Sequence, residues 1–177
     1  MATRSISIPA PAWYPSNDAA SFNSARIQVK QSSIAVPSPR YVEWLFGTST
    51  AEYILTEFVL PQNYVGTPVL NVYYKMTTAV ANEIDWGVAV AAVSDGDAQD
   101  MDADAFASTG AMAEVTVPST AGDMDVAAIT ISTGTHDDGM VAGDHVVFML
   151  FRDSLVPSSD ADSDAEFLGA DFTYSDV

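Results

Sequence analysis

The chain has 177 residues, of which 48% are hydrophobic, and 24 acidic against 6 basic side chains give it a formal net charge of −18. This length is enough for one domain with a buried core. The few Lys and Arg residues are scattered, which argues against a nucleic-acid partner. Without cysteine, neither disulfides nor thiolate metal sites can form. The sequence has no apolar run long enough for a membrane span or a secretory signal, so we expect a soluble, unprocessed chain with no membrane partner.

The charge is unevenly distributed. Residues 1–80 carry four acidic and five basic side chains, whereas residues 81–177 carry twenty acidic side chains and one basic one, Arg152. Such self-repulsion destabilises a compact chain in dilute buffer, but in about 1 M salt the screening length falls to about 3 Å. The composition therefore predicts a protein adapted to molar salt, and an ordinary acidic protein is the alternative. We expect the acidic loops to face solvent and the near-neutral first part to be covered by the core or by a partner.

Residues 1–24 contain three prolines around the adjacent aromatic residues Trp13 and Tyr14. This pattern predicts an extended N-terminal arm that precedes the folded domain and anchors on a neighbouring surface through the two rings. A strap that lies across its own domain is the alternative.

From residue 25 onward, apolar residues recur with a period of two, which is typical of strands. The predicted strands are residues 25–33, 52–60, 68–76, 84–93, 112–117, 126–133, 143–152 and 167–174, with 41–46 as a possible ninth. The alanine-rich segment 97–109 favours a short surface helix. The pattern predicts an all-β, two-sheet antiparallel sandwich over residues 25–177, a jelly roll of about eight strands, with an immunoglobulin-like sandwich as the alternative.

Alternating acidic residues near the C-terminus suggest a metal site. Asp160, Asp162, Asp164 and Glu166 have the spacing of oxygen ligands in calcium loops, so Ca²⁺ or Mg²⁺ is a candidate ion. The glycine of an EF-type loop is missing, however, and Glu166 comes too early to close one. The acidic residues of segment 95–104 are similarly incomplete. Because one residue in ten is Asp, a solvated loop without any cofactor is the simpler interpretation.

No sequence motif indicates catalysis. His136 with Asp137 and Asp138 fits a hairpin tip better than a catalytic or metal site, and His145 fits a strand. There is no nucleophile elbow and no phosphate-binding glycine loop, so we expect no enzymatic activity. Arg152 is predicted to end a buried strand and to pair with a carboxylate.

The motifs at Leu60-Pro61, Asp85-Trp86 and Gly143-Asp144, the strand 69–76 and the closing segment 172–174 resemble the single jelly-roll virion proteins of tailed bacteriophages and archaeal tailed viruses. The resemblance covers about residues 50–175. It implies a capsid decoration, turret or tail protein, generally a trimer or another cyclic oligomer. Together with the salt-adapted composition it implies a virus of halophilic archaea.

We therefore expect a non-enzymatic structural protein of such a virus particle, located in the virion. The expected partners are further copies of the chain, as a trimer or a pentamer, and the major capsid protein or other virion proteins. The residues expected to mediate assembly are Trp13, Tyr14, Arg26, Lys30 and Arg40. The alternative is a carbohydrate- or receptor-binding module of a virion. Its expected aromatic platform consists of Trp44, Tyr73, Tyr74 and Trp86.

Overall fold

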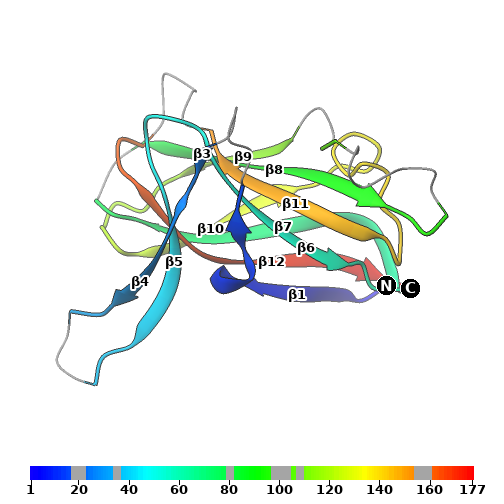
Figure 1. The fold of residues 1–177 in the computed structure, drawn as a ribbon, viewed down its shortest axis with the longest axis horizontal. Helices are drawn as coiled ribbons and strands as arrows, with labels where there is room; N and C mark the ends of the chain where they lie inside the picture. The colour runs from blue at the N-terminus through cyan, green and yellow to red at the C-terminus, as the bar shows by residue number, and fades with distance from the viewer. Residues whose placement is uncertain (17–22, 34–36, 79–81, 97–104, 107–109, 154–160) are drawn as a thin grey trace.

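In the computed structural model, two six-stranded sheets pack face to face (Figure 1). The structure describes residues 1–16, 23–33, 37–78, 82–96, 105–106, 110–153 and 161–177. Sheet A has the order β10-β7-β12-β5-β4, with β1 paired to β12, and sheet B has the order β2-β6-β11-β8-β9, with β3 paired to β6. Apart from the short parallel β3–β6 pair, all ladders are antiparallel.

The strands have the following bounds. Sheet A contains β1 (Thr3–Pro9), β4 (Arg26–Gln31), β5 (Arg40–Phe46), β7 (Tyr64–Met76), β10 (Met124–Thr130) and β12 (Ala165–Asp176). Sheet B contains β2 (Tyr14–Pro15), β3 (Asn23–Ser24), β6 (Glu52–Val59), β8 (Glu83–Val93), β9 (Ala111–Thr116) and β11 (His145–Arg152). A single 3-10 turn, η1 (Ala10–Ala12), links β1 to β2.

The predicted all-β, two-sheet antiparallel jelly roll is confirmed, and all nine predicted strands are present. The helix predicted over 97–109 lies almost entirely outside the described residues. The described part of the chain contains no helix of the length and hydrophobicity that a membrane span requires.

The core lies between the sheets and is rich in aromatic rings. Trp86 of β8 is fully buried, and its ring centroid lies 5.0 Å from Phe46, 5.6 Å from Tyr74 and 6.4 Å from Phe167. These rings come from three strands of sheet A, so Trp86 joins the two layers. Such ring pairs contribute about 0.5–1.5 kcal/mol each beyond their buried area.

Strand β12 lies at the centre of sheet A and changes partner along its length. It pairs with β5 over Ala165–Phe167 and with β1 from Gly169 onward, while β7 runs along its other edge. The change coincides with a register shift against β7 at Leu168 and with a φ of +145° at Gly169. A Cβ at Gly169 would meet the Ile8 carbonyl oxygen at 3.2 Å, so this close approach of β1 requires glycine.

The N-terminal segment was predicted to be an extended arm outside the folded domain. In the structure it is instead part of the sandwich. β1 extends sheet A and β2 extends sheet B, so the strap alternative describes this segment better. Trp13 is 3% exposed, stacks edge-on against Phe167 at 5.2 Å, and donates its Nε1–H to the Ile8 carbonyl at 3.4 Å. Trp13 is therefore a core residue and cannot anchor the chain on a neighbouring surface, whereas Tyr14 is 37% exposed.

The burial of Trp13 gives a direct test of the N-terminal segment. Trp13→Ala should lower the free energy of unfolding by about 3–5 kcal/mol, because it removes a large ring from the core. The matched variant Tyr14→Ala should cost less than about 1 kcal/mol. Denaturant titration in high salt measures both values. Equal effects of the two variants would contradict the assignment of this segment to the core.

Candidate functional site

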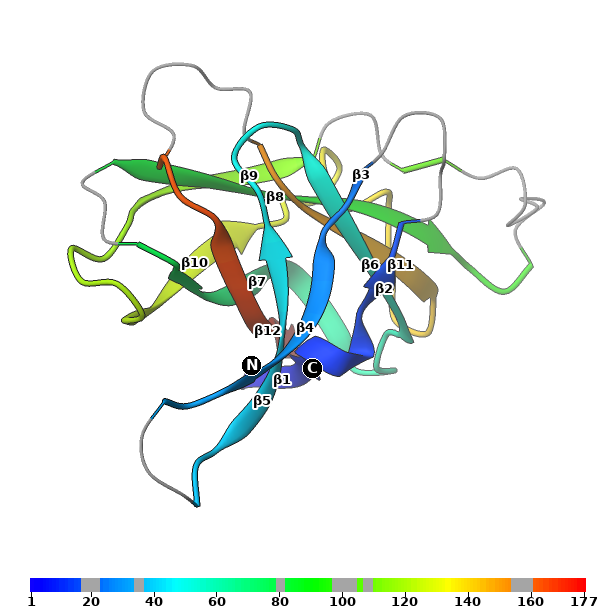
Figure 2. The ribbon, with the colours of Figure 1, turned by 60° about the vertical axis from the view of Figure 1, so that its left-hand side comes forward.

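The outer face of sheet A, which points away from sheet B, carries both charged and aromatic side chains. Because side chains alternate along a strand, Tyr74 and Phe167 point into the core while Tyr73, Lys75 and Glu166 point outward. The strands that contribute to this face are β4, β5, β12, β7 and β10, in spatial order (Figure 2).

Four charged side chains lie in a row across four adjacent strands of this face. We call them the charge row: Lys30 on β4, Glu43 on β5, Glu166 on β12 and Lys75 on β7. The distance from Lys30 Nζ to Glu43 Oε1 is 3.4 Å, and that from Lys75 Nζ to Glu43 Oε2 is 3.3 Å. Both lysines also form ion pairs with Glu166. Each carboxylate therefore contacts both ammonium groups.

The charge row is largely shielded from water. Glu43 and Glu166 have side chains that are 0% and 2% exposed, and Lys75 is 11% exposed, whereas Lys30 is 41% exposed. Gln28 Nε2 also donates a hydrogen bond of 2.6 Å to Glu43 Oε1. Burial lowers the pKa of Lys75, against the opposing effect of the Glu43 carboxylate, and repulsion from Lys30 lowers it further. The ion pairs with the two lysines offset part of the cost of burying these two carboxylates.

Two adjoining hollows border the charge row. The first has a volume of about 350 Å³ and is lined by Tyr41, Val42, Lys75, Gly122, Met124 and Leu168. The second has a volume of about 380 Å³ and includes Ser7, Tyr73, Met124, Leu168 and Asp171 in its lining. The two hollows share the lining residues Met124 and Leu168, so they adjoin, and together we call them the depression.

One tyrosine ring lines each hollow, and each of the two tyrosines contacts a charged side chain. Lys75 Nζ lies 5.6 Å from the centroid of the Tyr41 ring, within cation–π range. Tyr73 donates its hydroxyl hydrogen to Asp171 Oδ2 at 2.9 Å, and this hydrogen bond raises the pKa of Tyr73. Val126 and Met124 add apolar surface that is 39% and 62% exposed. The face can thus offer ring surfaces together with fixed hydrogen-bond donors and acceptors.

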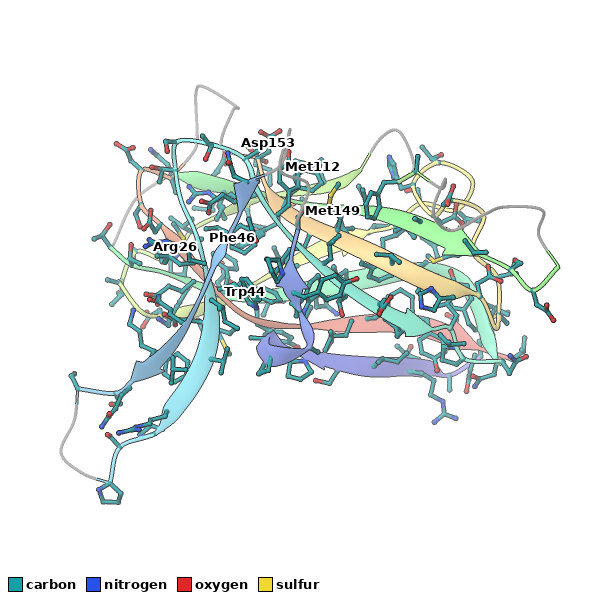
Figure 3. All side chains as sticks on the ribbon, viewed as in Figure 1. Arg26, Trp44, Phe46, Met112, Met149 and Asp153 are labelled. Carbon is teal, nitrogen blue, oxygen red and sulfur yellow. The ribbon has the colours of Figure 1, made fainter. Side chains whose placement is uncertain are left out.

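The predicted aromatic platform does not form as expected. Trp44, Tyr74 and Trp86 are at most 2% exposed and lie in the core, and Figure 3 shows Trp44 on β5. Only Tyr73 lies on the outer face. Tyr73 and Tyr74 are consecutive on β7, so strand geometry places them on opposite sides of the sheet. Sequence reasoning missed Tyr41, whose place beside Lys75 depends on strand pairings that periodicity does not reveal.

The predicted metal ligands are not gathered into one site. Glu166 belongs to the charge row because β12 places it directly opposite Lys75 on β7. Asp162 is exposed and Asp164 is half-buried, while Asp160 lies outside the described residues. Among the residues that the structure describes, no group of three or more His, Asp or Glu side chains could hold a metal ion.

Arg152 ends a buried strand, as predicted. It is 1% exposed at the end of β11 and donates from Nη1 to the Ser163 carbonyl at 2.8 Å and from Nη2 to the Ala161 carbonyl at 2.5 Å. Its charge also lowers the pKa of Glu52, although burial, which is the larger effect, raises it overall. Arg152 thus fixes the segment that leads into β12.

The two histidines lie away from the outer face of sheet A. Next to His136, the buried Asp137 accepts hydrogen bonds from the Gly134 and Gly139 amides at 2.7 and 3.3 Å, which fits the predicted turn. His145 begins β11, and its Nε2 lies 3.5 Å from Glu57 Oε2. Of the acidic segment 95–104, only Asp95 and Gly96 are described.

No known protein family and no curated protein matches this chain by sequence. Solved structures do match its fold. The chain is similar to the xylanase 10B fragment of Clostridium thermocellum with CBM22-1 and GH10 modules, complexed with xylohexaose, at 10% identity and a TM-score of 0.53. The match covers 98% of this chain and 28% of that one. It is also similar to the CBM22-1 xylan-binding domain of Paenibacillus barcinonensis Xyn10C, at 12% identity and a TM-score of 0.51, covering 97% and 94% of the two chains. The comparisons thus show the fold alone, which is a two-sheet jelly roll similar to that of these modules.

The charge row yields a stability prediction. Lys75→Met should lower the free energy of unfolding by about 3–5 kcal/mol at neutral pH, because it leaves two buried carboxylates with one half-exposed cation. Lys30→Met is the matched control and should cost less, since water reaches Lys30 and can replace part of its role. Denaturant titration measures both variants. A Lys75→Met protein as stable as the wild type would show that the carboxylates do not depend on this cation.

Proposed function

We propose that this chain is a non-catalytic carbohydrate-binding module and that the outer face of sheet A binds a neutral glycan. The observation that carries the proposal is the depression on this face, where Tyr41 and Tyr73 flank the charge row. A sugar ring presents apolar C–H groups on its faces and hydroxyl groups around its edge. Tyrosine rings suit the former, and the Lys75 ammonium and Asp171 carboxylate groups, which line the two hollows, suit the latter.

Charge favours a neutral glycan over an acidic one. The charge row contains two cations and two anions, and the adjacent Asp171 adds a further negative charge. The whole chain carries −18, so an acidic polysaccharide would meet repulsion that only high salt screens. Both solved structures described above contain modules associated with xylan or xylo-oligosaccharide, which makes xylohexaose a suitable first probe.

The virion role expected from the sequence, with its capsid partners and its halophilic archaeal setting, stays a prediction. Its basis is the acidic, salt-adapted composition of the chain. A glycan-binding jelly roll is compatible with a particle surface that contacts a host. The binding proposal stands on the outer face of sheet A alone and does not need the virion.

Tyr73→Ala and Tyr41→Ala should each weaken glycan binding about tenfold, which corresponds to the loss of one ring contact. Tyr53→Ala is the matched control, because Tyr53 lies on β6 of sheet B and packs against Phe151. Isothermal titration with xylohexaose and with soluble neutral and acidic polysaccharides in high salt measures the affinities, and thermal unfolding checks that each variant is folded.

Two outcomes would refute the proposal. One is that no glycan of the series binds the folded wild-type chain. The other is that Tyr53→Ala weakens binding as much as the two outer-face variants do.

A further inference from the structure

Strand β4 forms an exposed edge of sheet A. Among the residues that the structure describes, β4 pairs only with β5, and the β4–β5 hairpin extends beyond the two layers in both views (Figures 1 and 2). Ile27 and Val29 pair with Trp44 and Val42 and share their side of the sheet, yet they are 55% and 71% exposed. Edge strands with unpaired backbone groups and apolar side chains readily accept another strand.

The same hairpin concentrates positive charge in a strongly acidic molecule. Arg26, Lys30 and Arg40 lie on it, which is half of the six basic residues of the chain. The charge row also ends there, on the half-exposed Lys30. A carboxylate on the next strand would continue the row of paired charges across the sheet.

Strand β9, which among the described residues pairs only with β8 and also contacts β10 of sheet A, has complementary properties. Glu114 and Met112 are exposed on its outer side, with Met112 at 44%, and Glu114 lies directly opposite Asp85 of β8. A hydrogen bond with Glu83, together with repulsion from Glu83 and Asp85, raises the pKa of Glu114. Like charges that face each other on a sheet destabilise it, and a cation from outside would relieve this repulsion. Figure 3 shows Arg26 and Met112 on the two separate strands.

We propose that β4 of one copy of this chain adds to β9 of a second copy and joins sheet A of one to sheet B of the other. In the antiparallel register that places Gln28 opposite Glu114, Arg26 and Lys30 are the diagonal neighbours of Glu114, and Ile27 and Val29 lie opposite Val115 and Ala113. Charged pairs then lie on one side of the joint sheet and apolar pairs on the other.

The contact is head-to-tail, because each copy uses β4 to contact one neighbour and β9 to contact the other. Repetition of such a contact closes into a ring when the rotation between copies allows it. Self-pairing of β4 about a two-fold axis would instead bring Arg26 close to Lys30 of the other copy, and self-pairing of β9 would bring two Glu114 side chains together. The charges therefore favour the unlike pair of edges. This inference does not depend on glycan binding.

Sedimentation equilibrium of the full chain in about 1 M salt tests the interface, because this salt screens the overall net charge. The wild type should associate over a concentration range from micromolar to near-millimolar. Val29→Asp should weaken association at least about tenfold, since it places an unpaired charge in the contact. Val59→Asp is the matched control and should associate like the wild type, because Val59 is 60% exposed at the end of β6, away from both edges.

A charge exchange, measured in about 0.15 M salt so that the ion pair is less screened, distinguishes the proposed pair of edges from any other contact. Arg26→Glu and Glu114→Arg should each weaken association about tenfold, and both changes in one chain should restore it. A wild type that stays monomeric over the whole range would overturn the proposal. So would a Val29→Asp protein that associates like Val59→Asp, or a double variant no better than the single ones. Thermal unfolding checks each variant, and if Arg26→Glu fails to fold, the comparison of Val29→Asp with Val59→Asp decides the result.

Discussion

Two glutamates on sheet A are almost completely shielded from water, and each contacts the same two lysines. The Glu43 and Glu166 side chains would each carry a large desolvation penalty alone, and they remain compatible with the fold because Lys30 and Lys75 contact both. The four residues come from four adjacent strands. A one-residue slip of any of these strands would turn its charge toward the aromatic core, so the charge row also fixes the register of sheet A.

This constraint shapes the surface on which the proposed function rests. A fixed register holds Tyr41 over Lys75 and keeps Tyr73 in reach of Asp171, so the rings and the hydrogen-bonding groups have set positions before any ligand arrives. Preformed sites of this kind lose little entropy on binding. The molecule's strong negative charge lies elsewhere, and the row itself is neutral, which suits hydroxyl groups better than acidic substituents. At the edge of the same sheet, the row ends on Lys30, where a second copy can continue it.

The sequence pattern predicted where the strands lie, but it did not predict which strands pair with each other. Period-two patterns identified nine strands because the buried face of each, such as Leu70, Val72 and Tyr74 on β7, contrasts with its outer face. Pattern alone could not show that Glu166 lies opposite Lys75, so the acidic run of this Asp-rich chain was interpreted as a solvated loop, with a calcium loop as the alternative. The prolines near Trp13 suggested a free arm, although the alternation of Ile6 and Ile8 already fitted a strand with one side facing the core. The charge row and the depression both depend on long-range pairings, which explains why residue patterns did not reveal them.

Mapping of backbone amide chemical shifts during titration with xylohexaose tests the central claim most directly, because it reports where a glycan touches the folded chain. The account predicts that the shifts concentrate on β5, β7, β10 and β12 around Tyr41, Tyr73 and Lys75, and that sheet B stays unchanged. Shifts confined to sheet B or to the turns at the ends of the sandwich, with the outer face of sheet A unaffected, would contradict it.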